Sequence, residues 1–253
     1  MDSYAHRYAR RLTLTVILAL VVAGAVVAAA VAPEAAAEPA EPTDTSILLD
    51  AQQTRVDWNT VLILNGTLVA NFYPPVGLDG QEVRVERATG ASGPWTLVTT
   101  VTNASGPYYT GTYTYSEKAT RTYFWRMVFD GTAEYGPSTS NWVKIGVVPR
   151  LGKPAAPAKA KVKKKFTVKG SLKPRFKAGS RSVKLRWQIR KNGAWKNYKT
   201  TWAKVANAGS YSKYTAKIAV PRAGKFRFYA FAPATAKFVK GTSPFSRTVT
   251  VKK

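Results

Sequence analysis

The chain has 253 residues, with 39 Lys and Arg against 13 Asp and Glu, one His and no Cys. The absence of cysteine excludes disulfide bridges, thiolate metal ligands and cysteine nucleophiles. Since the single histidine, His6, precedes a hydrophobic segment, the rest of the chain cannot build a Ser-His-Asp triad or a His-ligated zinc site.

Residues 1–37 are predicted to be an export signal. Basic residues between His6 and Arg11 precede the apolar run Leu12–Ala32, and Ala35–Ala37 fits an A-x-A cleavage site. An uncleaved signal-anchor stays open, because 21 helical residues span roughly 31 Å at about 1.5 Å each. In either case we expect a hydrophobic export helix and an extracellular or cell-surface location for the remaining chain, and an uncleaved signal would also attach it to the membrane through this segment.

The chain beyond residue 44 has the pattern of an all-β protein with an internal repeat. Short β-rich runs alternate with Gly, Pro, Asn and Asp, and no segment has a convincing helical pattern. Four pairs of similar residues are offset by 100 to 104 positions: Gly66/Gly170, Trp95/Trp195, Tyr113/Tyr214 and Phe129/Phe231. A repeat of this length is the size of one β-sandwich domain.

The repeat predicts two domains joined by short linkers. Residues 38–45 form an acidic, Pro/Ala-rich linker, residues 46–148 the first sandwich, residues 149–158 a Pro/Ala linker and residues 159–253 the second sandwich. Alternation supports the strands: Val183, Leu185, Trp187 and Ile189 face one way, and the polar residues between them face the other.

The order of these segments resembles bacterial immunoglobulin-like tandem repeats of secreted and cell-wall actinobacterial proteins. The similarity is carried by NGTL and KGSLKP, by QEVRVER…GPWTLV and SVKLRWQIRKNGAWKNY, and by YFWRMVF and FRFYAF. It covers about residues 46–253. The resemblance implies two tandem immunoglobulin-like β-sandwiches that serve as surface, spacer or adhesion modules. The Cys…Trp…Cys spacing of antibody domains is absent.

Catalysis and metal binding find little support in the sequence. The nearest carboxylate cluster is Asp79, Glu82 and Glu86, where Glu82 and Glu86 share a strand face with Arg84 as a partner, which is typical of a solvated surface. Ser210–Lys213 matches S-x-x-K but lies at the start of a strand rather than a helix. We therefore expect no enzyme, no cofactor and no metal.

The aromatic residues allow two interpretations. Trp125, Phe129, Trp187, Phe228 and Phe231 lie on strands and are expected to fill the cores. Three further rings belong to one hairpin of the second half, and either pack there or form an exposed stacking platform for a ligand: Trp195, Tyr198 and Trp202.

Charge is the strongest functional signal. Residues 1–149 carry 10 basic and 13 acidic side chains, a net charge of −3, whereas residues 150–253 carry 29 basic and no acidic ones. A folded segment with no carboxylate cannot neutralise itself through internal salt bridges. The basic side chains are expected to point outward from both sheets, with Lys165, Lys169, Lys213 and Lys217 on one sheet.

The sequence thus predicts a non-catalytic cell-envelope protein whose basic second half binds an anionic cell-wall polymer or another extracellular polyanion. Export makes intracellular nucleic acid an unsuitable partner. The alternative is a structural or adhesive spacer with no specific ligand. The candidate polyanion-binding residues are Lys163, Lys164, Lys165, Lys169, Lys184, Arg186, Arg190, Lys217, Arg227 and Arg247.

Overall fold

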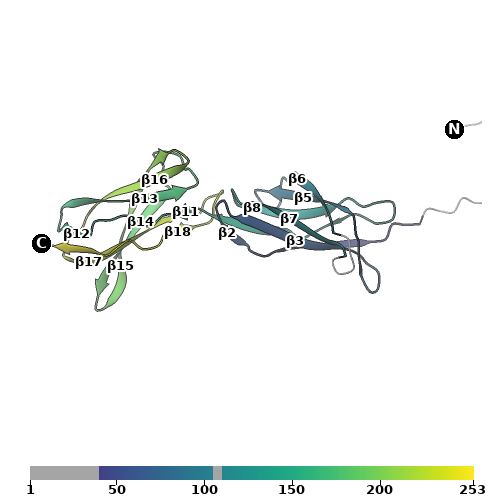
Figure 1. Ribbon diagram of the computed structural model, residues 1–253, viewed down its shortest axis with the longest axis horizontal. Coiled ribbons are helices and arrows are strands. Elements are labelled where there is room, and N and C mark those ends of the chain that lie inside the picture. The colour runs from purple at the N-terminus through teal and green to yellow at the C-terminus, as the bar shows by residue number, and fades with distance from the viewer. Residues whose placement is uncertain (1–39, 105–109) are drawn as a thin grey trace, which may run out of the picture. The chain divides into compact units, whose positions relative to one another are not determined.

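The computed structural model describes residues 40–104 and 110–253 (Figure 1). These residues form strands and connecting loops and contain no helix. The all-β prediction is confirmed for this part of the chain. Within it, no helix is long and apolar enough to cross a bilayer. The predicted export helix lies outside the described residues.

The first half of the described chain builds two layers around one core, and all their strand pairs are antiparallel except β2 with β10, which is parallel. One layer has the order β1-β3-β4, with β7 also pairing with β3, and the other has the order β2-β10-β8-β5-β6, with β9 pairing with β8. The strands are β1 (Thr45–Ala51), β2 (Arg55–Asp57), β3 (Val61–Ala70), β4 (Val76–Gly77), β5 (Glu82–Ala88), β6 (Thr96–Thr102), β7 (Thr112–Lys118), β8 (Tyr123–Phe129), β9 (Ser138–Thr139) and β10 (Val143–Val148).

The second half repeats this arrangement in one continuous sheet that turns back on itself. Its strand order is β11-β13-β16-β15-β14-β17-β19-β12, with β18 pairing with β17. The strands are β11 (Arg150–Leu151), β12 (Lys159–Lys161), β13 (Lys165–Lys173), β14 (Val183–Lys191), β15 (Ala194–Ala208), β16 (Tyr211–Ala219), β17 (Gly224–Ala232), β18 (Gly241–Thr242) and β19 (Val249–Lys252).

The long strand β15 links the two layers of the second half. Its first part, Ala194–Ala203, pairs with β14, and its last part, Lys204–Ala208, pairs with β16. The layers are therefore β11-β13-β16 and β14-β17-β19, with β15 at the edge of both, and the short strands β12 and β18 pair with β19 and β17. This division of seven strands between two sheets matches the ABED and CFG sheets of an immunoglobulin-like sandwich.

Each half has a hydrophobic core, and Phe238 of the second half packs into the core of the first. Trp125, Met127 and Leu64 are buried in the first core, and Tyr214, Phe226 and Phe228 in the second. The alternation read from β14 is confirmed, because Val183, Leu185, Trp187 and Ile189 are all buried. Burial at every second residue leaves the intervening polar residues on the outer face of the sheet.

The internal repeat extends to backbone irregularities. The pairing of β5 with β6 shifts register between Val85 and Glu86, and the pairing of β14 with β15 shifts between Trp187 and Gln188, 102 positions later. A β-bulge at the same place in each half means that Glu86 and Gln188 occupy equivalent positions.

A glycine opposite a buried tyrosine is also repeated. Gly66 pairs with Tyr113 and Gly170 pairs with Tyr214. The Tyr113 phenol donates a hydrogen bond to the Leu48 carbonyl oxygen, and the Tyr214 phenol donates one to the Gly152 carbonyl oxygen at 2.8 Å. A Cβ at either glycine would collide with the tyrosine hydroxyl, so each phenol requires a glycine below it.

The Pro/Ala segment 149–158, expected as a linker, contributes to the sheets of the second half. β11 pairs with β13, and Ala155 forms an isolated bridge with Lys169. Residues 41–253 form one compact unit. Within it, the Val239 amide donates to the Val147 carbonyl oxygen at 2.9 Å and the Thr122 amide to the Lys237 carbonyl oxygen at 2.8 Å.

Candidate functional site

The basic residues singled out from the sequence fall on both outer faces of the second half and on its loops. Lys165 and Lys169 on β13 and Lys217 on β16 are exposed on one layer. Lys184, Arg186 and Arg190 on β14 and Arg227 on β17 lie on the other. The remaining three are exposed outside the strands: Lys163 and Lys164 before β13, and Arg247 before β19.

On the second layer, basic and aromatic side chains alternate across neighbouring strands. Lys184 pairs with Trp202 on β15 and with Phe231 on β17, so one cation stands between two rings. We call this surface the cationic–aromatic face; its residues are Lys184, Arg186, Trp195, Trp202, Arg227, Phe231 and Phe245.

Each of these cations lies over a ring. The Lys184 ammonium is 4.4 Å from the centroid of Trp202, and the Arg186 guanidinium is 5.4 Å from that of Phe231. A cation over the face of an aromatic ring is attracted by the ring's quadrupole and remains charged. The rings therefore hold the positive charges in place without neutralising them.

Arg227 lies at the centre of the clearest cluster on this face. Its guanidinium carbon is 4.6 Å from the Trp195 centroid and 3.6 Å from the Phe245 centroid. Its Nε donates a hydrogen bond to the Gln188 side-chain oxygen at 2.7 Å. Desolvation by burial lowers the pKa of this guanidinium from its ordinary value. Because that ordinary value lies far above neutrality, Arg227 stays charged.

The first half contains the same arrangement with a carboxylate added. Arg126 lies 4.5 Å from the Trp95 centroid and forms an ion pair with Glu86 at 2.8 Å. Glu86 also forms an ion pair with Arg84 at 3.6 Å, as the sequence pattern predicted. The expectation of a solvated surface is wrong for Glu86, because its side chain is buried between these two arginines. Gln188 occupies the position of Glu86, so the second half keeps the arginine and the tryptophan but not the neutralising charge.

Other arginines of the first half are neutralised as well. Arg84 pairs with Asp130 at 2.8 Å, and Arg87 pairs with Glu117 at 3.3 Å. Arg150, at the start of the second half, reaches Asp57 of the first at 3.5 Å. Since residues 151–253 contain no carboxylate side chain, no Lys or Arg there has an acidic side-chain partner within that segment.

The three aromatic residues proposed as a stacking platform do not share one surface. Trp202 is exposed and Trp195 is half-buried, and both belong to the cationic–aromatic face. Tyr198 instead packs against the second core, with its ring centroid 5.7 Å from that of Phe226. The β-bulge beside Tyr198 in β15 explains this placement, because one extra residue turns the side chain to the opposite face.

The expected core aromatics are confirmed except for Phe231. Trp125, Phe129, Trp187 and Phe228 are buried. Phe231 is half-buried on the outer face, with Arg186 and Lys240 over its ring. Register explains the error: Arg84 pairs with Val128 and Arg186 with Tyr229, so Phe129 is equivalent to Ala230 rather than to Phe231. A shift of one residue moves a side chain to the other face.

Sequence reasoning did not identify Gln188 and Phe245, the other partners of Arg227. Gln188 could have been found by aligning the two halves at Glu86, where an acid is replaced by an amide. Phe245 lies in the loop before β19 and reaches Arg227 only through the fold.

Comparison with family models found no match, and comparison with curated proteins found no relative. Among solved structures, the chain is similar to an ICAM-5 D1–D4 ectodomain fragment, with a TM-score of 0.42 and 14% identity over 81% of this chain and 53% of that one. It is also similar to red sea bream transglutaminase, with a TM-score of 0.36 and 13% identity over 82% of this chain and 31% of that one. The chain thus spans about half of the first protein and about a third of the second.

Proposed function

We propose that this chain is an exported, non-catalytic cell-envelope protein whose second half binds an anionic wall polymer or another extracellular polyanion. The observation that carries the proposal is the pair of equivalent sites at Arg126 and Arg227. The first half supplies Glu86 to its arginine, and the second half supplies the uncharged Gln188. Two equivalent arginines on the same scaffold therefore differ: Arg126 in the first half is neutralised, and Arg227 in the second half has no ion-pair partner.

The physical argument concerns self-repulsion. Residues 150–253 carry 29 basic and no acidic side chains, and each Lys or Arg adds to a positive field that opposes folding. A bound polyanion relieves that repulsion and releases its own counterions, which makes binding favourable and strongly dependent on salt.

The cationic–aromatic face is the part of this surface that is best organised for binding. Arg227, held by two rings and the Gln188 oxygen, and Lys184, stacked on Trp202, keep defined positions. A positioned cation loses less conformational entropy on binding than a free one. The exposed Trp202 and Phe245 rings offer apolar surface to the repeating units of a polymer.

In this proposal the two halves are tandem immunoglobulin-like modules with different tasks. Residues 46–148, in which Arg84, Arg87 and Arg126 are paired with carboxylates, act as a spacer or contact another partner. Residues 159–253 supply the polyanion contact. The resemblance to bacterial surface repeats supports this division of roles, and the predicted export signal supports the location.

A binding assay at two salt concentrations tests the proposal. Residues 41–253, which include both cores, are added to purified cell walls in about 50 mM and about 500 mM NaCl, and to walls stripped of phosphate polymers. We expect retention on intact walls at low salt, loss at high salt, and little retention on stripped walls.

A matched pair of double variants locates the contact. Arg186→Gln with Arg227→Gln removes two charges from the cationic–aromatic face, and Lys118→Gln with Lys144→Gln removes two exposed charges from the first half. Only the first pair should weaken retention. Equal retention of all proteins at both salt concentrations would contradict the proposal and favour the alternative, a structural spacer without a specific ligand.

A further inference from the structure

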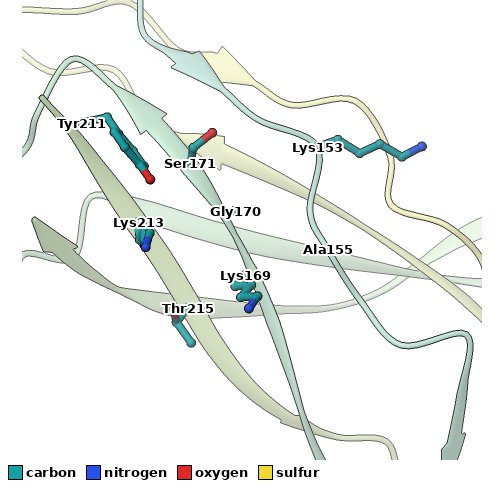
Figure 2. Close-up of a pocket in the computed structure, with 8 residues that line it drawn as sticks. All are labelled: Lys153, Ala155, Lys169, Gly170, Ser171, Tyr211, Lys213 and Thr215. Carbon is teal, nitrogen blue, oxygen red and sulfur yellow. The ribbon is translucent and has the colours of Figure 1, made fainter. Parts of the chain in front are cut away.

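A lysine-lined pocket lies on the layer opposite the cationic–aromatic face. It has a volume of about 340 Å³ and is lined by residues of β13, β16 and the segment after β11 (Figure 2). The lining residues are Lys153, Ala155, Lys169, Gly170, Ser171, Tyr211, Lys213 and Thr215.

An extra residue in the segment after β11 distinguishes the strand pairing beside this pocket from the equivalent pairing in the first half. The Gly152 amide bonds to Ser171, and Ala155 bridges Lys169, so that two residues, Lys153 and Pro154, stand opposite Gly170 alone. This is the residue count of a β-bulge, and proline at that point donates no backbone hydrogen bond. The first half has no such irregularity, because β1 pairs with β3 without interruption from Thr45 to Ala51.

The bulge coincides with a change in charge at the pocket. Lys169 precedes Gly170 and Lys213 precedes Tyr214, whereas Asn65 and Thr112 hold the equivalent positions beside Gly66 and Tyr113. The second half thus has two lysines where the first half has neutral polar side chains.

The register brings these two lysines within reach of one ligand. Lys169 pairs with Thr215, and Ser171 pairs with Lys213, so the lysines are diagonal neighbours with Cα atoms about 7–8 Å apart. Three residues that carry hydroxyl groups, Ser171, Thr215 and Tyr211, line the same pocket. Figure 2 shows the Lys153 side chain extending away from Lys169 and Lys213, so Lys153 borders the pocket and does not complete the pair.

We propose that this pocket is a phosphate subsite in which the Lys169 and Lys213 ammonium groups hold one phosphate group of the polyanion. Two point charges with adjacent hydroxyl donors suit a small anion that carries several acceptor oxygens. The inference rests on the proposed function and adds a second, lysine-based contact to it. Because the two sites lie on opposite layers of one sandwich, a single second half can bind two polymer segments.

The chain offers a control pair of the same geometry. Lys165 pairs with Ala219 and Thr167 with Lys217, so Lys165 and Lys217 are diagonal neighbours on the same two strands but outside the pocket. The double variant Lys169→Ala/Lys213→Ala is therefore compared with the double variant Lys165→Ala/Lys217→Ala. All four lysines are exposed, and both double variants remove two charges from one sheet face.

The first measurement is an NMR titration of residues 41–253 with inorganic pyrophosphate at constant ionic strength, with acetate as the comparison anion. We expect amide shifts at Lys169–Ser171 and Tyr211–Thr215 that saturate with pyrophosphate and are much smaller with acetate. The shifts should persist in the Arg186→Gln/Arg227→Gln protein and disappear in the Lys169→Ala/Lys213→Ala protein.

The second measurement is affinity for long-chain polyphosphate at low salt. The pocket variant should bind roughly tenfold more weakly than the unmodified protein. The control variant removes two other candidate contacts, so it should lose affinity too, but by only about twofold to threefold. Equal losses in the two variants would overturn the subsite and leave general polyanion binding intact. Failure of the unmodified protein to bind any polyanion would overturn the proposed function as well.

Discussion

Gln188 accepts a hydrogen bond from Arg227 at 2.7 Å, at the position where Glu86 of the first half forms an ion pair with Arg126 at 2.8 Å. Both arginines lie over a tryptophan at nearly the same distance, 4.6 Å from Trp195 and 4.5 Å from Trp95. One amide in place of one carboxylate thus changes the charge of the site while its packing is kept.

The substitution Gln188→Glu should convert the second site into a copy of the first. A carboxylate beside Arg227 neutralises that guanidinium, so affinity for an anionic polymer at low salt should fall by about threefold to tenfold. Fluorescence anisotropy with labelled polyphosphate measures the change. Gln53→Glu, an exposed residue of the first half, adds the same charge elsewhere and should have a smaller effect. Equal effects of the two substitutions would argue against a local site.

The reciprocal substitution Glu86→Gln should destabilise the first half. Glu86 is buried and contacts both Arg84 and Arg126, so its loss leaves two guanidinium groups with fewer partners. We expect the free energy of unfolding to fall by about 1–3 kcal/mol, measured by urea denaturation of residues 41–253. Glu82→Gln, at an exposed position of the same strand, is the control and should change it by less than about 0.5 kcal/mol. An unchanged unfolding midpoint for Glu86→Gln would show that these ion pairs contribute nothing.

Trp202→Ala should weaken polymer binding more than it weakens the fold. The Trp202 side chain is 42% exposed and supports the Lys184 ammonium at 4.4 Å, so its removal costs little core packing but frees the lysine. We expect an affinity loss of about twofold to fivefold, from a cation–π contribution of about 0.5–1 kcal/mol. Trp142 of the first half is 50% exposed, and Trp142→Ala serves as the matched control. If Trp142→Ala lowers affinity as much, the cationic–aromatic face has no special role.

Gly170→Ala should destabilise the second half through its tyrosine. The new Cβ would collide with the Tyr214 hydroxyl, which forces apart two paired strands at a cost of about 1–3 kcal/mol. Tyr214→Phe removes the hydrogen bond to Gly152 and should cost about 1–2 kcal/mol. Thermal unfolding of residues 41–253 measures both.

The double variant Gly170→Ala with Tyr214→Phe provides the internal test. Phenylalanine lacks the hydroxyl that the Cβ meets but keeps the ring carbons that the Cβ also approaches, so the collision is partly relieved and the combined loss should be smaller than the sum of the two single losses. Gly90→Ala is the control, since its Cβ would find no atom closer than 3.7 Å, and it should leave the unfolding temperature nearly unchanged. Strict additivity would contradict the proposed collision.

The sequence by itself determined the all-β architecture, the internal repeat and the division of charge. These properties are local or compositional. A period of two places Val183 and Ile189 on one face of a strand. The absence of acidic residues after Asp130 and Glu134 is read directly from the composition. The outward direction of Lys169, Lys184 and Arg186 follows from the same period.

Only the tertiary structure decided which of these residues lie together. Arg227 meets Trp195, Gln188 and Phe245 because three strands and a loop bring them together, and a bulge turns Tyr198 away to the core. A second bulge, at Lys153 and Pro154, lies at the border of the pocket beside Lys169. Register and bulges depend on pairing between distant segments, where one residue more or less changes the face of every following side chain. That pairing also explains why Phe129 is buried and Phe231 is not.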